Sequence, residues 1–385
     1  MKTLSLHSHY NRYLCICFCL CLAFVASSTL SAQVKFHDYW MVEEYLNAFP
    51  EQQAITEEFN LRVQGQAKPL AIKANPINIL MVYPGLQASD YWRRSVSAFK
   101  HRLDQLGIPY QLTSHFTKPG TDLNLQSELI GKTLKQKPDY LVFTLDAMKH
   151  QKLIGHVMSQ GHTKVILQNI TTPLKAFQSH QPFLYVGFDH SIGTQLLIQE
   201  YQSRFPEGGN YAILFGTQGY VSKIRGGVFE AAMSPKMDFY LQDSYYVNFD
   251  RQLAADATME LIANHTSEVG NLDLDFIYAA STDIALGVLD TLKQHGLKKR
   301  VVVNGWGGGS AELDSIRQGE LDFTVMRMND DNGVAMAEAI ALDLEGKTDQ
   351  VPTIYSGSFR LVDQQTDENQ LQRFEARAFR YSNNK

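Results

Sequence analysis

The sequence predicts an α/β protein with two lobes, each a doubly wound parallel sheet covered by helices. From Pro76 onwards, short apolar runs rich in β-forming residues alternate with helical stretches. The runs are apolar at consecutive positions, which is typical of strands that are buried on both faces of a parallel sheet. About eleven such runs are too many for one doubly wound sheet. We therefore expect two lobes, and the 385 residues are enough to build them.

Residues 1–32 have the pattern of a secretory signal peptide. Lys2 and Arg12 precede an apolar run, and small residues follow that run up to Ala32. A membrane anchor is the alternative, but the apolar run is short for a bilayer span. We expect the chain to be exported, with cleavage after Ala32 or after Ser28.

The cysteines support export to the periplasm. All four lie in the same apolar run, at Cys15, Cys17, Cys19 and Cys21, so the exported chain would contain none. A bacterial lipid-anchor signal needs a small residue before its cysteine, whereas Leu20 stands before Cys21. An exported chain without cysteine has no disulfide scaffold, which indicates a periplasmic protein with large cores.

The predicted elements follow in order along the rest of the chain. Residues 33–76 predict an N-terminal helical extension, because apolar residues recur there at helical spacing before a polar loop. The next helix is expected to begin after the N-cap Asp90 and to end at Gly107. Helices are expected between most of the predicted strands. These strands lie at 77–83, 109–112, 139–145, 164–169, 183–188, 210–216, 238–247, 275–281, 300–306 and 321–326.

Polar and aromatic side chains follow several of these strands at their carboxyl ends. Ligands of open α/β sheets bind at this edge, where loops lead into helices. The residues found there are Gln87, Ser89, Trp92, Asn169, Arg225, Thr282, Trp306 and Arg327, with Ser281 and Asp283 beside Thr282. Two guanidinium groups together with amides, hydroxyls and indoles indicate a pocket for a small, hydroxyl-rich, anionic ligand.

Several of these candidates also have a purely structural interpretation. Ser89, Asp90 or Asp283 could cap a helix. Arg225 could lie on an exposed helix face. Trp306 could be a core residue, although the glycines on both sides of it suit a ring that lines a cleft better.

The sequence does not indicate an enzyme, a metal site or a cofactor. It contains no GxSxG or HExxH motif, and the glycine-rich run GWGGGS comes late in the chain and carries an indole where a dinucleotide loop needs bare backbone. The run MNDDNG (328–333) lacks the ligand spacing of a calcium loop and is better explained as the acidic start of a helix. A net charge of −5 gives no support to nucleic-acid binding.

Several long stretches resemble the periplasmic sugar-binding proteins of the ribose-binding type, and among them the autoinducer-2 receptors of vibrios. These stretches include VYPGLQASDYW, FIYAASTD, NGWGGGSAELD and VMRMNDDNGVAMAEAI. The resemblance implies two lobes joined by three crossings, near Gly187, Met328 and Tyr355. The N-terminal lobe would comprise 77–187 plus 328–354, and the C-terminal lobe 188–327 plus 355–379.

The same resemblance implies a ligand and a partner. Such receptors bind autoinducer-2 as a furanosyl borate diester, an anion, in the cleft between the lobes. By similarity the ligand contacts fall on the eight candidate residues given above. The expected partner is the periplasmic domain of a LuxQ-like membrane sensor histidine kinase in quorum sensing, and no nucleic acid is expected. The alternative is a sugar-binding protein of an ABC transporter, which would share the fold.

Overall fold

The computed structural model describes residues 36–144, 149–234 and 238–383. The predicted signal peptide, residues 1–32, lies outside the described residues. Within the described ranges, every helix is too short or too polar to cross a lipid bilayer.

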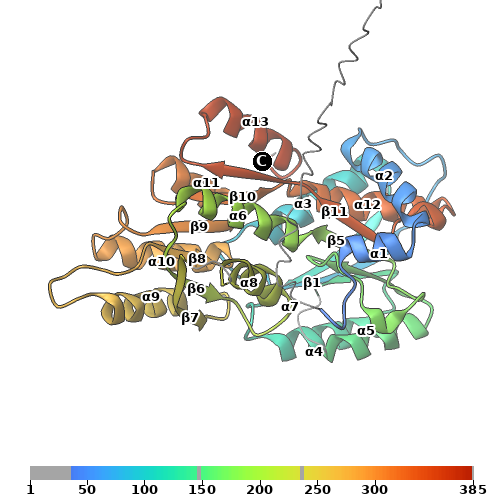
Figure 1. Ribbon diagram of the computed structural model, residues 1–385. Coiled ribbons are helices and arrows are strands. Elements are labelled where there is room, and N and C mark those ends of the chain that lie inside the picture. The colour runs from blue at the N-terminus through green and yellow to red at the C-terminus, as the bar shows by residue number, and fades with distance from the viewer. Residues whose placement is uncertain (1–35, 145–148, 235–237, 384–385) are drawn as a thin grey trace, which may run out of the picture. The chain divides into compact units, whose positions relative to one another are not determined.

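Two six-stranded sheets form the two lobes, which confirms the predicted fold class (Figure 1). The first sheet has the order β11-β5-β4-β3-β1-β2, and its paired strands are all parallel. Its strands are β1 (Ile77–Tyr83), β2 (Tyr110–Phe116), β3 (Tyr140–Phe143), β4 (Lys164–Gln168), β5 (Leu184–Phe188) and β11 (Ile354–Gly357).

The second sheet has the order β12-β10-β9-β8-β6-β7. It is parallel except at one edge, where β12 runs antiparallel to β10. Its strands are β6 (Gly209–Phe215), β7 (Phe239–Tyr246), β8 (Phe276–Ala279), β9 (Val302–Gly307), β10 (Phe323–Arg327) and β12 (Phe359–Asp363). The central strands are buried along nearly their whole length, as their continuous apolar runs predicted.

Helices cover both sheets (Figure 1). Those associated with the first sheet are α3 (Tyr91–Leu106), α4 (Leu123–Leu134), α5 (Lys149–Ser159) and α12 (Asp330–Leu344). Those associated with the second sheet are α6 (His190–Arg204), α7 (Tyr220–Ser222), the π-helical turn η2 (Lys223–Gly227), α8 (Val228–Met233), α9 (Arg251–His265), α10 (Thr282–Gln294), α11 (Ser310–Arg317) and α13 (Glu368–Ala378). Two single 3₁₀ turns, η1 (Lys175–Phe177) and η3 (Thr348–Gln350), lie in connections.

The chain changes sheet three times, after β5, after β10 and after β11. The second change leads into α12, which packs closely on α3 because Gly333 has no side chain; a Cβ at this position would lie 2.4 Å from the Ser95 carbonyl oxygen. At the third change, β11 still pairs with β5, so the predicted crossing near Tyr355 falls inside this strand. The chain leaves the first sheet at Ser358, where the short connection to β12 begins.

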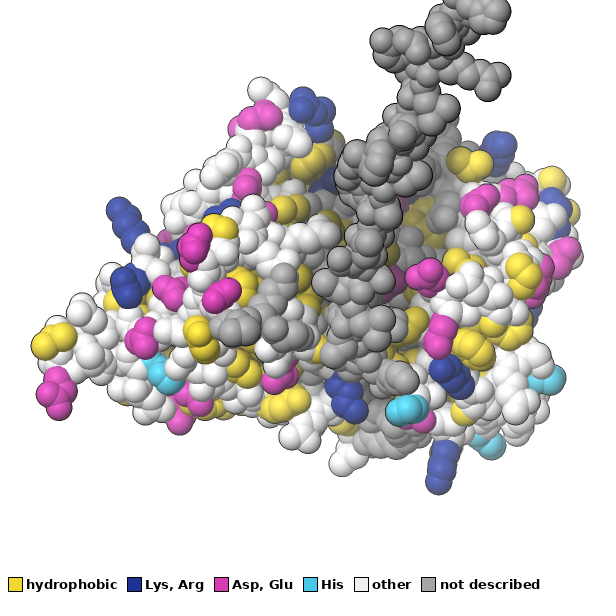
Figure 2. Space-filling model, in the orientation of Figure 1, with side chains coloured by type: hydrophobic (Ala, Val, Ile, Leu, Met, Phe, Trp, Pro, Cys, Tyr) yellow, Lys and Arg dark blue, Asp and Glu magenta, His cyan; other side chains and the backbone are white. Residues whose placement is uncertain are grey.

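The N-terminal segment forms α1 (Val42–Ala48) and α2 (Glu51–Gln64), which pack on the first lobe beside β11 and α12. The Tyr45 hydroxyl donates to the Thr353 side chain at 3.0 Å, and Arg62 forms an ion pair with Glu338. The face shown in Figure 2 carries interspersed acidic, basic and apolar side chains, without a broad basic surface of the kind that binds nucleic acid.

Candidate functional site

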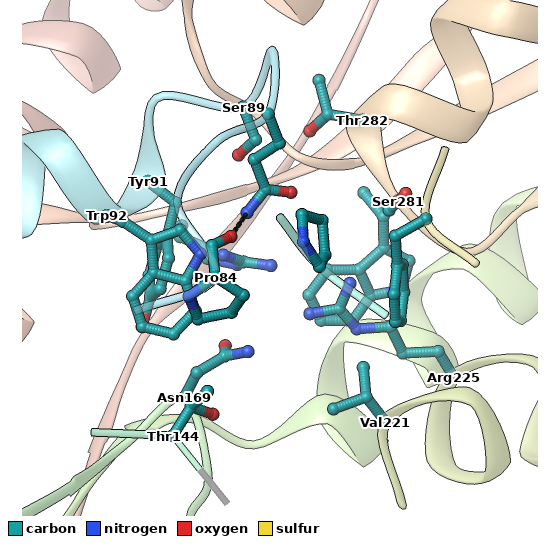
Figure 3. Close-up of a pocket in the computed structure, with 15 residues that line it drawn as sticks. Pro84, Ser89, Tyr91, Trp92, Thr144, Asn169, Val221, Arg225, Ser281 and Thr282 are labelled. Atoms are coloured by element: carbon teal, nitrogen blue, oxygen red, sulfur yellow. Dashed lines mark hydrogen bonds between the residues drawn. The ribbon is translucent and has the colours of Figure 1, made fainter. Parts of the chain in front are cut away.

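A small cavity lies at the carboxyl-terminal ends of strands from both sheets (Figure 3). Its volume is about 70 Å³, well below the roughly 300–1,000 Å³ of pockets that take drug-sized ligands. All eight candidate residues line the cavity, as does Ser281, whereas Asp283 does not. The other lining residues are Pro84, Tyr91, Pro119, Thr144, Val221 and Phe249.

Two buried arginines dominate the electrostatics of this cavity. Arg225, in the π-helical turn η2, is 4% exposed, and Arg327, at the end of β10, is 5% exposed. Burial lowers the pKa of both guanidinium groups, and the charge of Arg327 lowers that of Arg225 further. Among the described residues no carboxylate forms an ion pair with either arginine, and Nε of each has no hydrogen-bond partner. The cavity therefore holds two positive charges without a direct ion pair. Glu312 acts on the pKa of both groups in the opposite direction to burial, so it offsets these charges only in part.

The indole of Trp306 forms the surface on which both guanidinium groups lie. The Cζ atoms of Arg225 and Arg327 are 3.7 and 5.0 Å from its ring centroid. Trp306 is only 1% exposed, so the two interpretations of this residue are both partly right: it belongs to the core and it lines the cavity. Arg225 is held in addition by a 2.9 Å hydrogen bond from Nη1 to the carbonyl oxygen of Ala280.

The glycine-rich loop is shaped around Glu312, a buried carboxylate that the sequence analysis missed. Glu312 accepts hydrogen bonds from the backbone N–H groups of Trp306 at 3.0 Å and Gly308 at 2.7 Å, and one from the Thr324 hydroxyl. A Cβ at Gly305 would lie 2.6 Å from this carboxylate. The loop N–H groups are thus used internally by the protein, so this loop is no phosphate-binding turn.

The first lobe supplies the opposite wall of the cavity. Trp92, in the first turn of α3, stacks on Tyr83 with ring centroids 4.7 Å apart. The Gln87 amide donates to the Pro84 carbonyl at 2.8 Å (Figure 3). Asn169 follows β4 with a left-handed φ of 65°, a conformation that asparagine adopts more readily than most other residues except glycine.

Hydrogen bonds join the two lobes beside the cavity. Asp283, on α10, accepts from the backbone N–H groups of Ala88 at 2.8 Å and Ser89 at 3.3 Å. The helix cap of α10 is Ser281, whose hydroxyl accepts from Ile284 N–H at 3.3 Å. Asp283 therefore serves neither as a cap nor as a cavity wall, because its carboxylate reaches across to the other lobe.

A second inter-lobe contact involves Asp90, which occupies the predicted N-cap position of α3, as Gly107 occupies the predicted end of that helix. Asp90 stands at the N-cap position of α3, but its side chain accepts no bond from that helix, because its backbone is not in the extended conformation that aims a capping side chain. The carboxylate accepts instead from the Ser310 hydroxyl at 2.8 Å and the Ser310 N–H at 3.3 Å, and it pairs with Arg94.

Gly309 gives a test of this closure. A Cβ at Gly309 would lie 2.3 Å from Oδ1 of Asp90, so the Gly309→Ala variant must displace the carboxylate that bridges to Ser310. If a ligand that contacts both lobes binds this closed arrangement better than an open one, we expect about three- to tenfold weaker binding and a larger radius of gyration in X-ray scattering. The control is Gly131→Ala on α4, where a Cβ meets no atom within 4 Å. Equal affinity of both variants would mean that this contact does not govern closure.

His190 is a further residue that the sequence analysis missed. It is fully buried at the start of α6, directly after β5, and its Nε2 lies 3.3 Å from Asn169 Oδ1 and 3.5 Å from Arg225 Nη2. Burial, followed by the charges of Arg225 and Arg327, lowers the pKa of His190 well below its ordinary value, so the imidazole is neutral.

Comparison with known proteins gives the family. Residues 79–376 match the model described as "Periplasmic binding protein domain". The chain belongs to this family. Membership implies a periplasmic location. The proteins of this family bind solutes and are not enzymes, which confirms the prediction of a non-enzymatic protein.

Three solved structures of periplasmic binding proteins illustrate the shared fold. An ABC transporter solute-binding protein from Actinobacillus succinogenes with bound D-allose is 20% identical, with a TM-score of 0.65 over 76% of this chain and 99% of that one. A Bacillus halodurans solute-binding protein with bound myo-inositol is 17% identical, with a TM-score of 0.64 over 79% and 99%. The fructose-binding periplasmic domain of a hybrid two-component system is 20% identical, with a TM-score of 0.65 over 77% and 94%.

Proposed function

We propose that this protein is a periplasmic receptor of the LuxP type, which binds autoinducer-2 as its furanosyl borate diester and signals through a LuxQ-like membrane sensor kinase in quorum sensing. The observation that carries the proposal is the buried pair Arg225 and Arg327, which face one small cavity without a carboxylate partner among the described residues.

Burying two unpaired cations is unfavourable, so the site favours a ligand that brings negative charge. A guanidinium group donates along a planar fork and can bind paired oxygens, such as those of a borate diester, through charge-assisted hydrogen bonds. A neutral sugar could accept hydrogen bonds from the same groups but would bring no negative charge to them. The charge of the site therefore favours an anion over a neutral sugar.

The remaining lining suits the rest of such a ligand. The hydroxyls of Ser89 and Thr282 and the amides of Gln87 and Asn169 can exchange hydrogen bonds with ligand hydroxyls. Indoles from both lobes supply apolar faces for the carbon skeleton of a ring. The cavity of about 70 Å³ is small, which favours a single small ring over an oligosaccharide.

Binding and signalling would be coupled through closure of the lobes. Trp92 and Asn169 belong to the first lobe, and Arg225 and Arg327 belong to the second. A ligand that touches all four residues binds the closed form better than the open form and shifts the population towards it. A membrane sensor that contacts both lobes could then distinguish the two forms. The fructose-binding domain of a hybrid two-component system is a case in which this fold occurs in a signalling protein.

The second candidate function is a sugar-binding protein that delivers its cargo to an ABC transporter. The similar solute-binding proteins with bound D-allose and myo-inositol favour this alternative, because both belong to ABC transporters and bind neutral polyols. The two functions differ in the charge of the ligand and in the membrane partner.

Calorimetric titration distinguishes the two functions. We expect autoinducer-2 to bind more tightly with borate present than without it, and ribose and galactose to bind weakly or not at all. The physical reason is that borate esterification adds the negative charge that Arg225 and Arg327 require. Tight binding of ribose or galactose, with no effect of borate on autoinducer-2, would support the transporter function instead.

A further inference from the structure

His190 lies behind the cavity wall and contacts candidate ligand residues of both lobes. Its Nε2 is 3.3 Å from the side-chain oxygen of Asn169, which belongs to the first lobe, and 3.5 Å from Nη2 of Arg225, which belongs to the second. Its ring meets the Trp306 indole nearly edge-on, with centroids 5.2 Å apart. Gly193, one turn later in α6, leaves room for the same indole, since a Cβ there would lie 2.9 Å from it. His190 itself is fixed by this packing.

One nitrogen of His190 thus faces two groups with opposite demands. A guanidinium group only donates hydrogen bonds, and an amide oxygen only accepts them. In a neutral imidazole Nε2 either carries the proton and donates a hydrogen bond, or lacks the proton and accepts a hydrogen bond. Each tautomer therefore satisfies only one of the two neighbours. The other nitrogen, Nδ1, has no hydrogen-bond partner in the described part of the chain and does not favour either tautomer.

We propose that His190 is a positioning residue whose tautomer is coupled to occupation of the cavity. Without an anion, Nε2 accepts from Arg225 and the proton resides on Nδ1, because Nη1 of Arg225 already donates to Ala280 whereas the described residues offer Nη2 no acceptor besides His190. When an anion accepts from Arg225, Nδ1 releases a proton to solvent and Nε2 takes one up. The Nε2–H group then donates to the Asn169 oxygen and holds the amide NH₂ group towards the ligand.

Figure 3 shows Asn169 and Arg225 on different sides of the cavity, so a change at His190 reaches both walls. The net charge of the imidazole is the same in both tautomers. The proposal has two halves. The unliganded half, the Nδ1–H tautomer in the empty protein, depends only on the geometry. The liganded half, the change to the Nε2–H tautomer, rests on the proposed function, because it requires an anionic ligand.

The unliganded half is tested by NMR on protein labelled with ¹⁵N in its histidine side chains. The signals of His190 are those that disappear in the His190→Phe variant. We expect the Nδ1–H tautomer in the unliganded protein and a shift to Nε2–H in Arg225→Met, which removes the donor. The control Arg373→Ala, an exposed arginine on α13, should leave the tautomer unchanged. An Nε2–H tautomer in the unliganded parent, or no shift in Arg225→Met, would overturn the proposal.

The liganded half is tested by binding of borated autoinducer-2. Phenylalanine at 190 keeps a ring against Trp306 but removes both polar roles, so His190→Phe should weaken binding by about tenfold. Glutamine can either donate or accept at its end, so His190→Gln should stay within about threefold of the parent. The saturated parent should show the Nε2–H tautomer.

Two outcomes separate this proposal from the proposed function. If the parent binds no autoinducer-2 but shows the expected tautomers without ligand, the proposed function fails and the geometric half stands. If the parent binds autoinducer-2 and both His190 variants bind it equally well, the coupling is refuted. The melting temperature of each variant reports whether it is folded. If His190→Phe does not fold, His190→Gln serves to assign the His190 signals. The NMR measurements on the parent and on Arg225→Met then still decide whether the tautomer proposal holds.

Discussion

Replacing Arg327 with alanine is expected to weaken binding of borated autoinducer-2 by at least tenfold, and Arg225→Ala should behave in the same way. Each guanidinium group would make charge-assisted hydrogen bonds to the anion, worth about 1.5–3 kcal/mol each. A tenfold loss corresponds to about 1.4 kcal/mol, so the loss of one such bond is sufficient. Calorimetric titration measures the effect directly. Arg327→Lys should recover only part of the affinity, because an ammonium group cannot reproduce the planar fork.

Removing the charge of Arg327 while keeping its bulk should not destabilise the unliganded protein. Arg327 is 5% exposed, and burial lowers its pKa. In the part of the chain that the structure describes, its Nε lacks a partner and the guanidinium forms no ion pair. An uncompensated buried charge is a cost to the fold, so Arg327→Met should keep or raise the melting temperature while affinity falls. A lower affinity together with an unchanged or higher melting temperature would indicate that Arg327 serves ligand binding and not the stability of the fold.

Arg373→Ala is the matched control, since it removes a positive charge from an exposed position on α13. It should change affinity by no more than a small factor, because solvent and salt screen the charge of an exposed side chain. An Arg327→Ala or Arg225→Ala variant that is folded and binds as tightly as the parent would remove that arginine from the proposed site.

The fold class could be predicted because buried parallel strands leave an unambiguous pattern of consecutive apolar residues. Where the pattern weakens, the prediction weakens too. β2 lies at the edge of its sheet and carries Thr113, Ser114 and His115 on its exposed half, so its predicted end at 112 falls short. β11 and β12 were not among the predicted strands, because Ser356, Gly357 and Ser358 interrupt their apolar residues.

The rule that ligands bind at the carboxyl ends of strands brought together residues that do line one cavity. It could not assign contacts that depend on how the lobes meet. Asp283 and Ala88 are 195 positions apart, and nothing local indicates that a carboxylate in the first turn of α10 reaches across the cleft. Glu312 lies in a helix where a carboxylate ordinarily faces solvent. His190 directly follows β5, and the same rule would have selected it if histidine had been counted among the polar candidates.

The largest effect on stability is expected far from the cavity, at Glu338 on α12. This carboxylate is 1% exposed and accepts from Nε of Arg102 at 2.6 Å, while Arg62 of the N-terminal extension pairs with its other oxygen. Arg102, on α3, is itself fully buried and also donates to the Tyr381 hydroxyl at 2.9 Å and to the Gly65 carbonyl at 3.1 Å. Glu338 therefore links α2, α3 and α12 through one buried group.

Glu338→Ala should lower the free energy of unfolding by about 3–5 kcal/mol, because it leaves the Arg102 cation buried without its partner. Denaturant titration measures this change. The control is Asp290→Ala: Asp290 accepts two hydrogen bonds from Arg251 but lies at the surface, where a salt bridge contributes about 0–1 kcal/mol. Similar losses in both variants would show that the Glu338 network is solvated in solution.

A double variant separates the charge from the packing at this position. If the cost of Glu338→Ala comes from the orphaned cation, then Arg102→Met combined with Glu338→Leu should recover most of the lost free energy, since apolar side chains of similar size can replace a buried ion pair at little cost. Arg62 is more exposed than Arg102, with 29% of its side chain accessible, so it can turn its charge to water in the double variant. A double variant as unstable as Glu338→Ala would mean instead that the loss comes from the hydrogen bonds of Arg102 to Tyr381 and Gly65 and from packing, not from the orphaned charge.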